Sequence, residues 1–285
     1  MRKICFLSMD SLENYVSDDE IAIPFLNELG WQVETISWRD SAVDWNDFEA
    51  VIIRTPWNYQ KSPNEFLEVL RKIDASKARL ENPLKIVEWN LSKQYLRELE
   101  AKKIKIVPTI WDEKTVDETN FNRWREHFQT DEIIIKPIIS ATAEFTYRLK
   151  KFSPELTEIF ANKPFMIQPF MPKIVTEGEF SLFYFGGIYS HTILKTPKVK
   201  DFRVQEEHGG IITQIMPSEK LLQTAQKVFN QISDELLYAR IDFVRDENDN
   251  FCLMELELIE PALYFRMDKD APEEFAKTVN NWLNR

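Results

Sequence analysis

The chain has 285 residues, of which 44% are hydrophobic and 29% charged, and its formal net charge is −11. An acidic surplus of this size argues against a nucleic-acid partner or an anionic membrane surface, because both attract excess Lys and Arg. The apolar run near the start is too short for a signal peptide, and no later segment suits a bilayer span. Cys5 and Cys252 lie in apolar runs that predict buried thiols. We therefore expect a cytoplasmic globular protein.

The first part of the sequence alternates predicted strands with predicted helices. In chain order, these strands and helices cover residues 3–9, 18–31, 31–38, 48–59 and 63–76. This alternation predicts an open parallel α/β sheet, in which functional loops follow the carboxyl ends of the strands. Arg54, Thr55 and Asn58 follow the buried strand at 51–53, so we expect them to face a cleft and help select a substrate.

The rest of the sequence predicts a different arrangement of strands. Helices are expected at 91–103, 120–130, 219–233 and 272–285, and further strands at 104–111 and 132–140. From residue 165 onward the pattern becomes antiparallel, with hairpins at 178–196 and 238–261; Gly186 and Gly187 mark the first turn. We expect a multi-lobe protein of α/β and α+β type, with lobes at 1–90, 91–168 and 169–285.

The segment LMELELIEP, residues 253–261, carries carboxylates on an apolar strand. Glu255 and Glu257 are two residues apart, so both side chains leave the same face of a sheet. If Asp242 pairs on that face, three carboxylates converge, and a cation or protonation must relieve their repulsion. Oxygen ligands of this kind suit Mg²⁺. The alternatives are a solvated sheet face or an edge strand protected against aggregation.

Several polar side chains interrupt other apolar segments. Lys136 lies late in the run IIIKP, and its ammonium group either reaches solvent at the strand end or points into a cleft. Lys93 raises the same question on a helix. Gln168, within MIQPFM, lies where the chain passes between lobes, so this segment is either a linker or a surface for a flat base.

The loop KDFRVQEEHGG, residues 200–210, is polar and ends in glycines. Arg203 in this loop, and Arg240 in the second hairpin, are candidates for bidentate recognition of phosphate or carboxylate, although single arginines are more often surface residues. His208 and Gly209 are expected on the substrate side. The sequence contains neither a P-loop nor a dinucleotide-binding fingerprint, so a bound nucleotide would need another mode of recognition.

Taken in order, these features resemble the ATP-grasp superfamily and in particular its glutathione synthetase-like branch. The matching segments are the α/β first lobe, the helix with Lys93, and then IIIKP, IQPF, GEFS, DFRVQEEHGG, RIDF and MELELIEP. Within that branch, RTPWNY, KDFRVQEEHGG and ELELIEPALYF are most similar to the enzymes that close D-cycloserine from O-ureido-D-serine. The resemblance covers essentially the whole chain.

The resemblance implies a role for each matching position. Lys93 and Lys136 would contact the phosphates of ATP, and the hinge at 165–170 would bind adenine through its backbone and through Gln168, Pro169 and Phe170. Glu177 or Glu179 would hold the ribose, and Asp242, Glu255 and Glu257 would bind Mg²⁺. Arg203 and Arg240 would stabilise the γ-phosphoryl group or the substrate carboxylate. Glutathione synthetase-like enzymes usually have Asn in place of Glu257, so one or two ions are expected, with Mn²⁺ as an alternative.

The implied reaction is ATP-dependent formation of a C–N bond from a small amino-acid-like substrate. A carboxylate would become an acylphosphate, an amine would attack it, and ADP and phosphate would leave, with a lid around residues 105–168 excluding water. The alternatives are a peptide or amino-acid ligase with another acceptor, a nucleotide-binding module without turnover, and a kinase. A homodimer is left open by the sequence.

Overall fold

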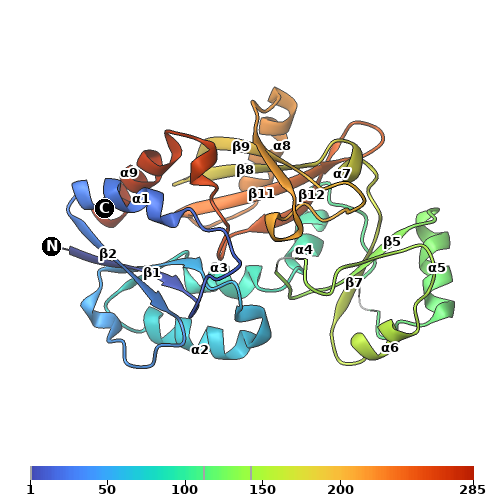
Figure 1. Cartoon of the computed structure of the whole chain (residues 1–285), viewed down its shortest axis with the longest axis horizontal. Coiled ribbons are helices and arrows are strands. Elements are labelled where there is room, and N and C mark those ends of the chain that lie inside the picture. Colours follow the sequence, from blue (N-terminus) through green and yellow to red (C-terminus); the bar gives the residue numbers. More distant parts are fainter. Residues whose placement is uncertain (1, 112, 142) are drawn as a thin grey trace.

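The computed structural model describes residues 2–111, 113–141 and 143–285, and three sheets organise them (Figure 1). The first sheet is parallel, in the order β2-β1-β3-β4. Its strands and helices are β1 (Arg2–Ser8), α1 (Asp19–Glu28), β2 (Trp31–Ser37), β3 (Ala50–Thr55), α2 (Pro63–Asp74), β4 (Arg79–Glu81) and α3 (Leu84–Asn90). The predicted parallel α/β sheet is confirmed; the short β4 and α3 were not predicted.

A small antiparallel sheet, in the order β6-β5-β7, forms the lobe that extends from the rest of the molecule. Its strands and helices are α5 (Glu118–Phe128), β5 (Ile133–Pro137), β6 (Tyr147–Leu149), α6 (Glu155–Ile159) and β7 (Phe165–Pro169). Trp124, Phe160 and Phe165 belong to its own hydrophobic core. The segment 104–111 is not the predicted strand, since it forms only isolated bridges with the strands on either side.

The third sheet is antiparallel, in the order β10-β9-β8-β11-β12. Its strands and helices are α7 (Lys173–Thr176), β8 (Glu179–Phe185), β9 (Ile188–Thr196), β10 (Ile211–Gln214), α8 (Glu219–Phe229), β11 (Tyr238–Arg245), β12 (Phe251–Glu257) and α9 (Ala271–Leu283). Both predicted hairpins are present, and Gly186 and Gly187 have the positive φ angles that the first turn requires. Helix α4 (Tyr95–Ala101) packs its apolar face against this sheet.

The lobes are held together along the outer edge of β12, the strand that carries Glu255 and Glu257. Asn90 donates from Nδ2 to the carbonyl oxygen of Leu256 at 2.8 Å and accepts from the backbone N–H of Leu258 at 3.0 Å. Asn82 donates to the carbonyl oxygen of Leu258 at 2.8 Å. Side chains from the first lobe therefore satisfy an edge that would otherwise present open backbone groups.

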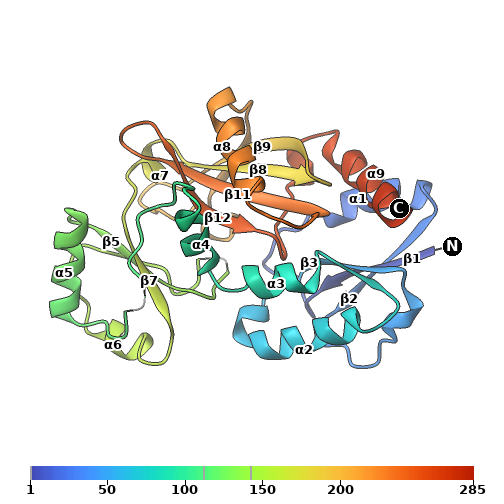
Figure 2. The ribbon, with the colours of Figure 1, turned by 180° about the vertical axis from the view of Figure 1, so that it is seen from behind.

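The last helix returns to the first lobe. Helix α9 lies against α1, and the two share a core with β1 and β8 (Figure 2). Short 3₁₀ helices occur at Trp45–Asp47, Tyr59–Lys61, Glu206–His208 and Phe265–Met267. No helix in the described part of the chain has the length and apolar character needed to cross a membrane.

Candidate active site

One cavity lies where the three sheets approach each other, and it collects most of the predicted site residues. The segment between α3 and α4 contributes Lys93, the small sheet contributes Lys136 and the hinge, and the large sheet contributes its charged face. Predicted site residues that line it are Lys93, Lys136, Gln168, Pro169, Phe170, Glu179, Arg203, Arg240, Asp242, Glu255 and Glu257. Residues far apart in the sequence are thus brought to one wall.

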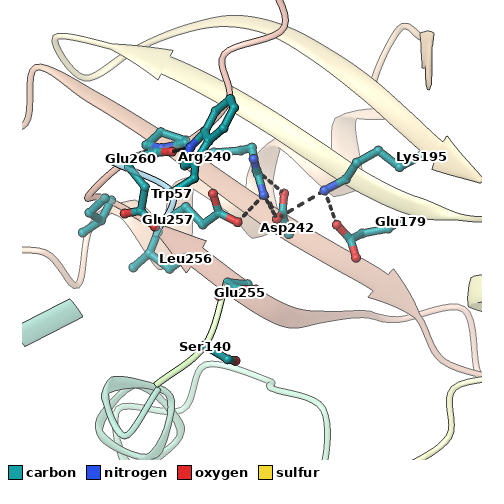
Figure 3. Close-up of polar contacts among 12 residues, drawn as sticks. Trp57, Ser140, Glu179, Lys195, Arg240, Asp242, Glu255, Leu256, Glu257 and Glu260 are labelled. Atoms are coloured by element: carbon teal, nitrogen blue, oxygen red, sulfur yellow. Dashed lines mark hydrogen bonds and ion pairs between the residues drawn. The ribbon is translucent and has the colours of Figure 1, made fainter. Parts of the chain in front are cut away.

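A chain of alternating charges crosses the large sheet (Figure 3). Lys195 forms an ion pair with Glu179 and lies 3.5 Å from Oδ2 of Asp242. Arg240 donates to Asp242 through Nε and Nη2, at 3.1 and 2.9 Å, and pairs on its other side with Glu257. Each buried charge therefore has an opposite charge beside it, which offsets the cost of removing it from water.

Strand register explains why these side chains meet. Asp242 is paired with Glu255, and Arg240 with Glu257, across the antiparallel ladder of β11 and β12. Glu179 is paired with Lys195 across β8 and β9. Because side chains two residues apart share a face, the sheet directs the charged set into the cavity while Leu256 and Leu258 enter the core behind it. A register shift between Asp242 and Phe243 pairs Leu253 with Phe243 and places it in the same core.

The two lysines predicted to contact phosphate have different environments. Lys93 lies 2.8 Å from Oε1 of Glu255 and donates to the carbonyl oxygen of Ser140 at 2.9 Å. Lys136 is 9% exposed and forms no hydrogen bond or ion pair with any side chain that the structure describes. Burial lowers the pKa of Lys136 to about 8, with the nearby charge of Glu255 opposing the shift. An anion in the cavity would stabilise its charged form.

The carboxylates on β12 and just beyond it also have shifted pKa values. Burial raises the pKa of Glu257 to about 8 against the opposing charge of Arg240. Burial likewise raises the pKa of Glu260 to about 7. For Glu255 the cations Lys93 and Lys136 outweigh burial, so its pKa lies below the usual value. The cavity therefore contains carboxylates that a further cation would stabilise.

The three predicted metal ligands do not offer equal numbers of oxygens. Asp242 uses both carboxylate oxygens on Arg240 and Lys195, whereas Glu255 and Glu257 each leave Oε2 without a hydrogen bond to the described residues. Accordingly, no group of three ligating side chains is arranged for a metal within these residues. Mg²⁺ commonly binds one or two carboxylates and completes its coordination shell with phosphate oxygens. The donor chemistry fits this ion through Glu255 and Glu257.

Another part of the cavity lining is apolar. Val107, Ile134 and Phe170 line it together with the hinge strand β7. Gln168 is buried and donates from Nε2 to Thr109 Oγ1 at 2.9 Å, so its side chain is held in place. An apolar surface beside the backbone of β7 suits a nucleobase.

Six predicted site residues lie outside the cavity lining, and four of them are outside the loop at 200–210. Arg54 is fully buried and donates to Asp19 and to the carbonyl oxygen of Pro261, both at 2.9 Å. Thr55 donates to Ser8 and Asn58 accepts from Trp38 Nε1. Glu177 forms an ion pair with Arg245 at 3.1 Å, whereas Glu179 lines the cavity. Arg54 and Thr55 occur where the strand is still buried, before the chain turns to the cavity.

The loop at 200–210 reaches the cavity through other residues than expected. His208 and Gly209 are not in the lining, but Arg203, Glu206 and Glu207 are. Arg203 forms a bidentate pair with Asp201, with 2.9 Å between Nη2 and Oδ2, which leaves its guanidinium fixed at the wall.

Among the lining residues that the sequence did not single out are Trp57, Tyr59, Lys195, Glu260 and Tyr264. Lys195 carried a usable signal, because it interrupts the alternating run TILKT just as Lys136 interrupts IIIKP. Trp57 and Tyr59 are the immediate neighbours of Asn58 in the sequence. The prediction that Asn58 faces the cavity was therefore wrong by one position, and its two neighbours line the cavity instead. Glu260 ends the segment LMELELIE but lies beyond the strand.

Two comparisons with known proteins found similar sequences. Residues 4–82 match the family model for the N-terminal domain of the D-cycloserine synthetase DcsG. The cycloserine biosynthesis protein DcsG of Streptomyces lavendulae is 26% identical over 275 residues, which cover 88% of this chain and 89% of that protein.

Solved structures show the same fold. The crystal structure of the D-cycloserine synthetase DcsG superposes with a TM-score of 0.83 at 22% identity and covers 99% of both chains. The ATP-grasp ligase PsnB, complexed with a phosphomimetic variant of its minimal precursor, Mg and ADP, has a TM-score of 0.68 at 13% identity and covers 99% of this chain and 98% of its own. The predicted fold is confirmed: the chain has the fold of ATP-grasp ligases, and its sequence is similar to that of the cycloserine biosynthesis protein DcsG.

Proposed function

We propose that the protein is an ATP- and Mg²⁺-dependent carboxylate–amine ligase or cyclase that acts on a small amino-acid-like substrate. The observation that carries the proposal is the position of Lys136, a buried ammonium group without an ion-pair partner among the described residues, on the same cavity as Glu255 and Glu257. A buried ammonium group without an ion-pair partner is unfavourable until an anion binds to it. Its position near two carboxylates suits a polyphosphate with a bound metal ion, since the ammonium group would bind phosphate and the carboxylates would bind the ion.

The reaction divides into two steps that need no covalent attachment to the enzyme. A carboxylate oxygen of the substrate attacks the γ-phosphorus, the bond to the β-phosphate oxygen breaks, and ADP leaves. An amine then attacks the acyl carbon, the C–O bond to phosphate breaks, and the amine proton passes to phosphate or water. Positioning and charge neutralisation supply most of the acceleration in such transfers.

Named residues take on these tasks. Lys93 and Lys136 would bind phosphate oxygens, and the surface at Gln168, Pro169 and Phe170 would hold adenine. Glu255 and Glu257 would hold Mg²⁺, which neutralises charge on the β- and γ-phosphates when bound. Asp242 would join them only after leaving Arg240 or Lys195. Whether that exchange occurs would decide between one and two ions. Mn²⁺ in place of Mg²⁺ is a separate alternative.

The remaining roles concern the substrate and the ribose. Arg203 and Arg240 would stabilise the transferred phosphoryl group and orient the substrate carboxylate, since both present guanidinium groups to the cavity. Glu179 is the better placed of the two glutamates for the ribose, because Glu177 is paired outside the lining. The small lobe around β5–β7 would act as the lid, and a homodimer remains a separate proposal for measurement in solution.

The test is a screen for ADP release with Mg²⁺–ATP and candidate carboxylates. Amino acids, dipeptides and O-ureido-D-serine are supplied with and without hydroxylamine as an external amine, which traps acylphosphates. ADP release with a hydroxamate product supports a ligase or cyclase. Magnesium-dependent ATP binding without ADP release from any of these compounds would contradict the proposal and favour a binding module.

A peptide ligase is the second candidate, because PsnB was solved with a precursor peptide. Turnover of dipeptides or longer peptides, with no turnover of single amino acids, would favour it.

A further inference from the structure

The charged row ends at a carboxylate, Glu260, with two aromatic side chains in the same cavity lining. Glu260 lies just after β12, and Trp57 and Tyr59 reach it from the first lobe. Figure 3 shows Glu260 and Trp57 beside Arg240 and Glu257, at the end of the charged row away from Glu179. This group of residues, Trp57, Tyr59 and Glu260, is the acidic–aromatic corner.

The corner is held rigidly by contacts outside the cavity. Trp57 Nε1 donates to the backbone carbonyl oxygen of Glu260 at 2.9 Å, which ties the first lobe to the end of β12. The ring of Tyr59 stacks on Phe66 with centroids 4.9 Å apart, and Trp57 lies against Tyr15. Both aromatic side chains are therefore preorganised rather than free to rotate away.

Glu260 differs from the other carboxylates on this wall. Glu179, Asp242, Glu255 and Glu257 each form an ion pair with a lysine or arginine. Glu260 is partly buried and lines the same cavity, but within the described part of the chain no basic side chain forms an ion pair with it. A desolvated carboxylate without a cation is unfavourable, and a ligand cation would relieve it.

We propose that Glu260 determines substrate specificity by binding the primary ammonium group of the substrate, with Trp57 and Tyr59 enclosing that group. This inference rests on the proposed function, because it places the substrate in the same cavity as the nucleotide. Aromatic faces attract cations, and together with a carboxylate they select an ammonium group over a neutral one. Arg240, on the adjacent part of the wall, presents a positive charge where the substrate carboxylate is expected.

Lys136 and Glu260, which both lack an ion-pair partner among the described residues, would then bind different ligands. Lys136 would bind phosphate, and Glu260 would bind the ammonium group. A substrate with both a carboxylate and an ammonium group spans the space between Arg240 and Glu260. The corresponding acid without nitrogen satisfies only one of these contacts.

The test compares amines with their desamino analogues on the wild type and on Glu260→Gln. The probes are alanine with propionate, serine with 3-hydroxypropionate, and O-ureido-D-serine with its desamino analogue. Binding is measured by ligand-observed NMR in the presence of Mg²⁺–ADP, and turnover by ADP release. We expect the wild type to bind at least one amine more tightly than its desamino analogue. Glu260→Gln should weaken the binding of that amine about 30-fold or more and should change KM more than kcat.

Two further variants separate specificity from folding. Glu260→Asp keeps the charge and should keep most of the preference, and Glu207→Gln removes an exposed carboxylate at the same cavity and should leave the preference intact. Mg²⁺–ATP binding by Glu260→Gln reports an intact nucleotide site. The inference is overturned if the wild type binds no amine, if it binds desamino analogues equally well, or if Glu260→Gln keeps the preference. ADP release in those cases would leave the ligase proposal standing, and its absence from every carboxylate would remove both.

Discussion

Nζ of Lys93 lies 2.8 Å from Oε1 of Glu255, so a predicted phosphate ligand and a predicted metal ligand are paired with each other. The same lysine also holds the small lobe, because its backbone N–H donates to the carbonyl oxygen of Ile138 at 2.8 Å and its ammonium group donates to Ser140. Mg²⁺ on Glu255 would release Lys93 toward phosphate. Under the proposed function, the pair would link metal binding to the position of residues 138–140.

Removing Lys136 should weaken nucleotide binding without harming the fold. Lys136→Met replaces a buried ammonium group that has no ion-pair partner in the described chain, so the desolvation cost of that charge disappears. We expect an unchanged or higher melting temperature, and a Kd for Mg²⁺–ATP raised about 10- to 100-fold, as for the loss of a charged hydrogen bond. Calorimetric titration and a thermal melt measure the two effects. A lower melting temperature with unchanged affinity would contradict the assignment.

Lys195→Met is the matched comparison and should behave in the opposite way. Lys195 is 2% exposed and compensates both Glu179 and Asp242, so its loss leaves two buried carboxylates short of a cation. We expect the free energy of unfolding to fall by about 3–5 kcal/mol in urea titrations. Equal stability of the two lysine variants would show that the charged row does not stabilise the sheet.

Asn90→Leu should destabilise the edge of β12. The substitution removes the partners of two buried backbone groups, the carbonyl oxygen of Leu256 and the N–H of Leu258. Each unsatisfied group costs about 1–3 kcal/mol, so we expect a loss of about 2–6 kcal/mol in urea unfolding. Asn230→Ala, at an exposed position on α8's end, serves as the control and should change stability little.

His191 should make stability depend on pH. Its ring stacks on Phe183 with centroids 4.2 Å apart, and Nε2 donates to the carbonyl oxygen of Leu263 at 3.1 Å. Burial lowers its pKa from 6.5 to about 4, with Asp268 opposing the shift. The folded state therefore favours neutral imidazole, and this contribution is present above pH 6.5 and lost as the pH falls toward 4, by up to about 3 kcal/mol.

Urea unfolding of the wild type and His191→Gln between pH 7 and pH 4 measures this contribution. The difference in free energy of unfolding between the two proteins should shrink as the pH falls, whereas the same change at exposed His127 should leave the pH dependence as in the wild type. A difference that stays constant with pH would exclude His191 as the titrating group.

Much of the site follows from the sequence because strand periodicity is simple. The two-residue spacing of Glu255 and Glu257 places them on one face, and the hairpin brings Asp242 opposite Glu255 as expected. The sequence left two placements open for Lys136, solvent at the strand end or a cleft, and the residue lines the cavity. These features depend on local geometry, which short segments determine.

Other features depend on packing between distant segments and could not be predicted this way. Arg54 pairs with Asp19 and Pro261, which only the folded chain brings together. The exposed-looking loop after β3 turns Trp57 and Tyr59 toward the cavity instead of Asn58. Which oxygens of Asp242 remain available likewise depends on Lys195, a partner from another hairpin.

The central claim is that Glu255 and Glu257 hold Mg²⁺ beside the phosphates of ATP, and Mg²⁺-dependent ATP binding to Glu255→Gln tests it most directly. The amide keeps the shape of the side chain but loses the charge that binds the ion and pairs with Lys93. Calorimetry with and without Mg²⁺ should show that the wild type gains affinity from the ion and that folded Glu255→Gln gains little and releases no ADP. Equal magnesium-dependent gains in affinity, or retained ADP release, would contradict the claim.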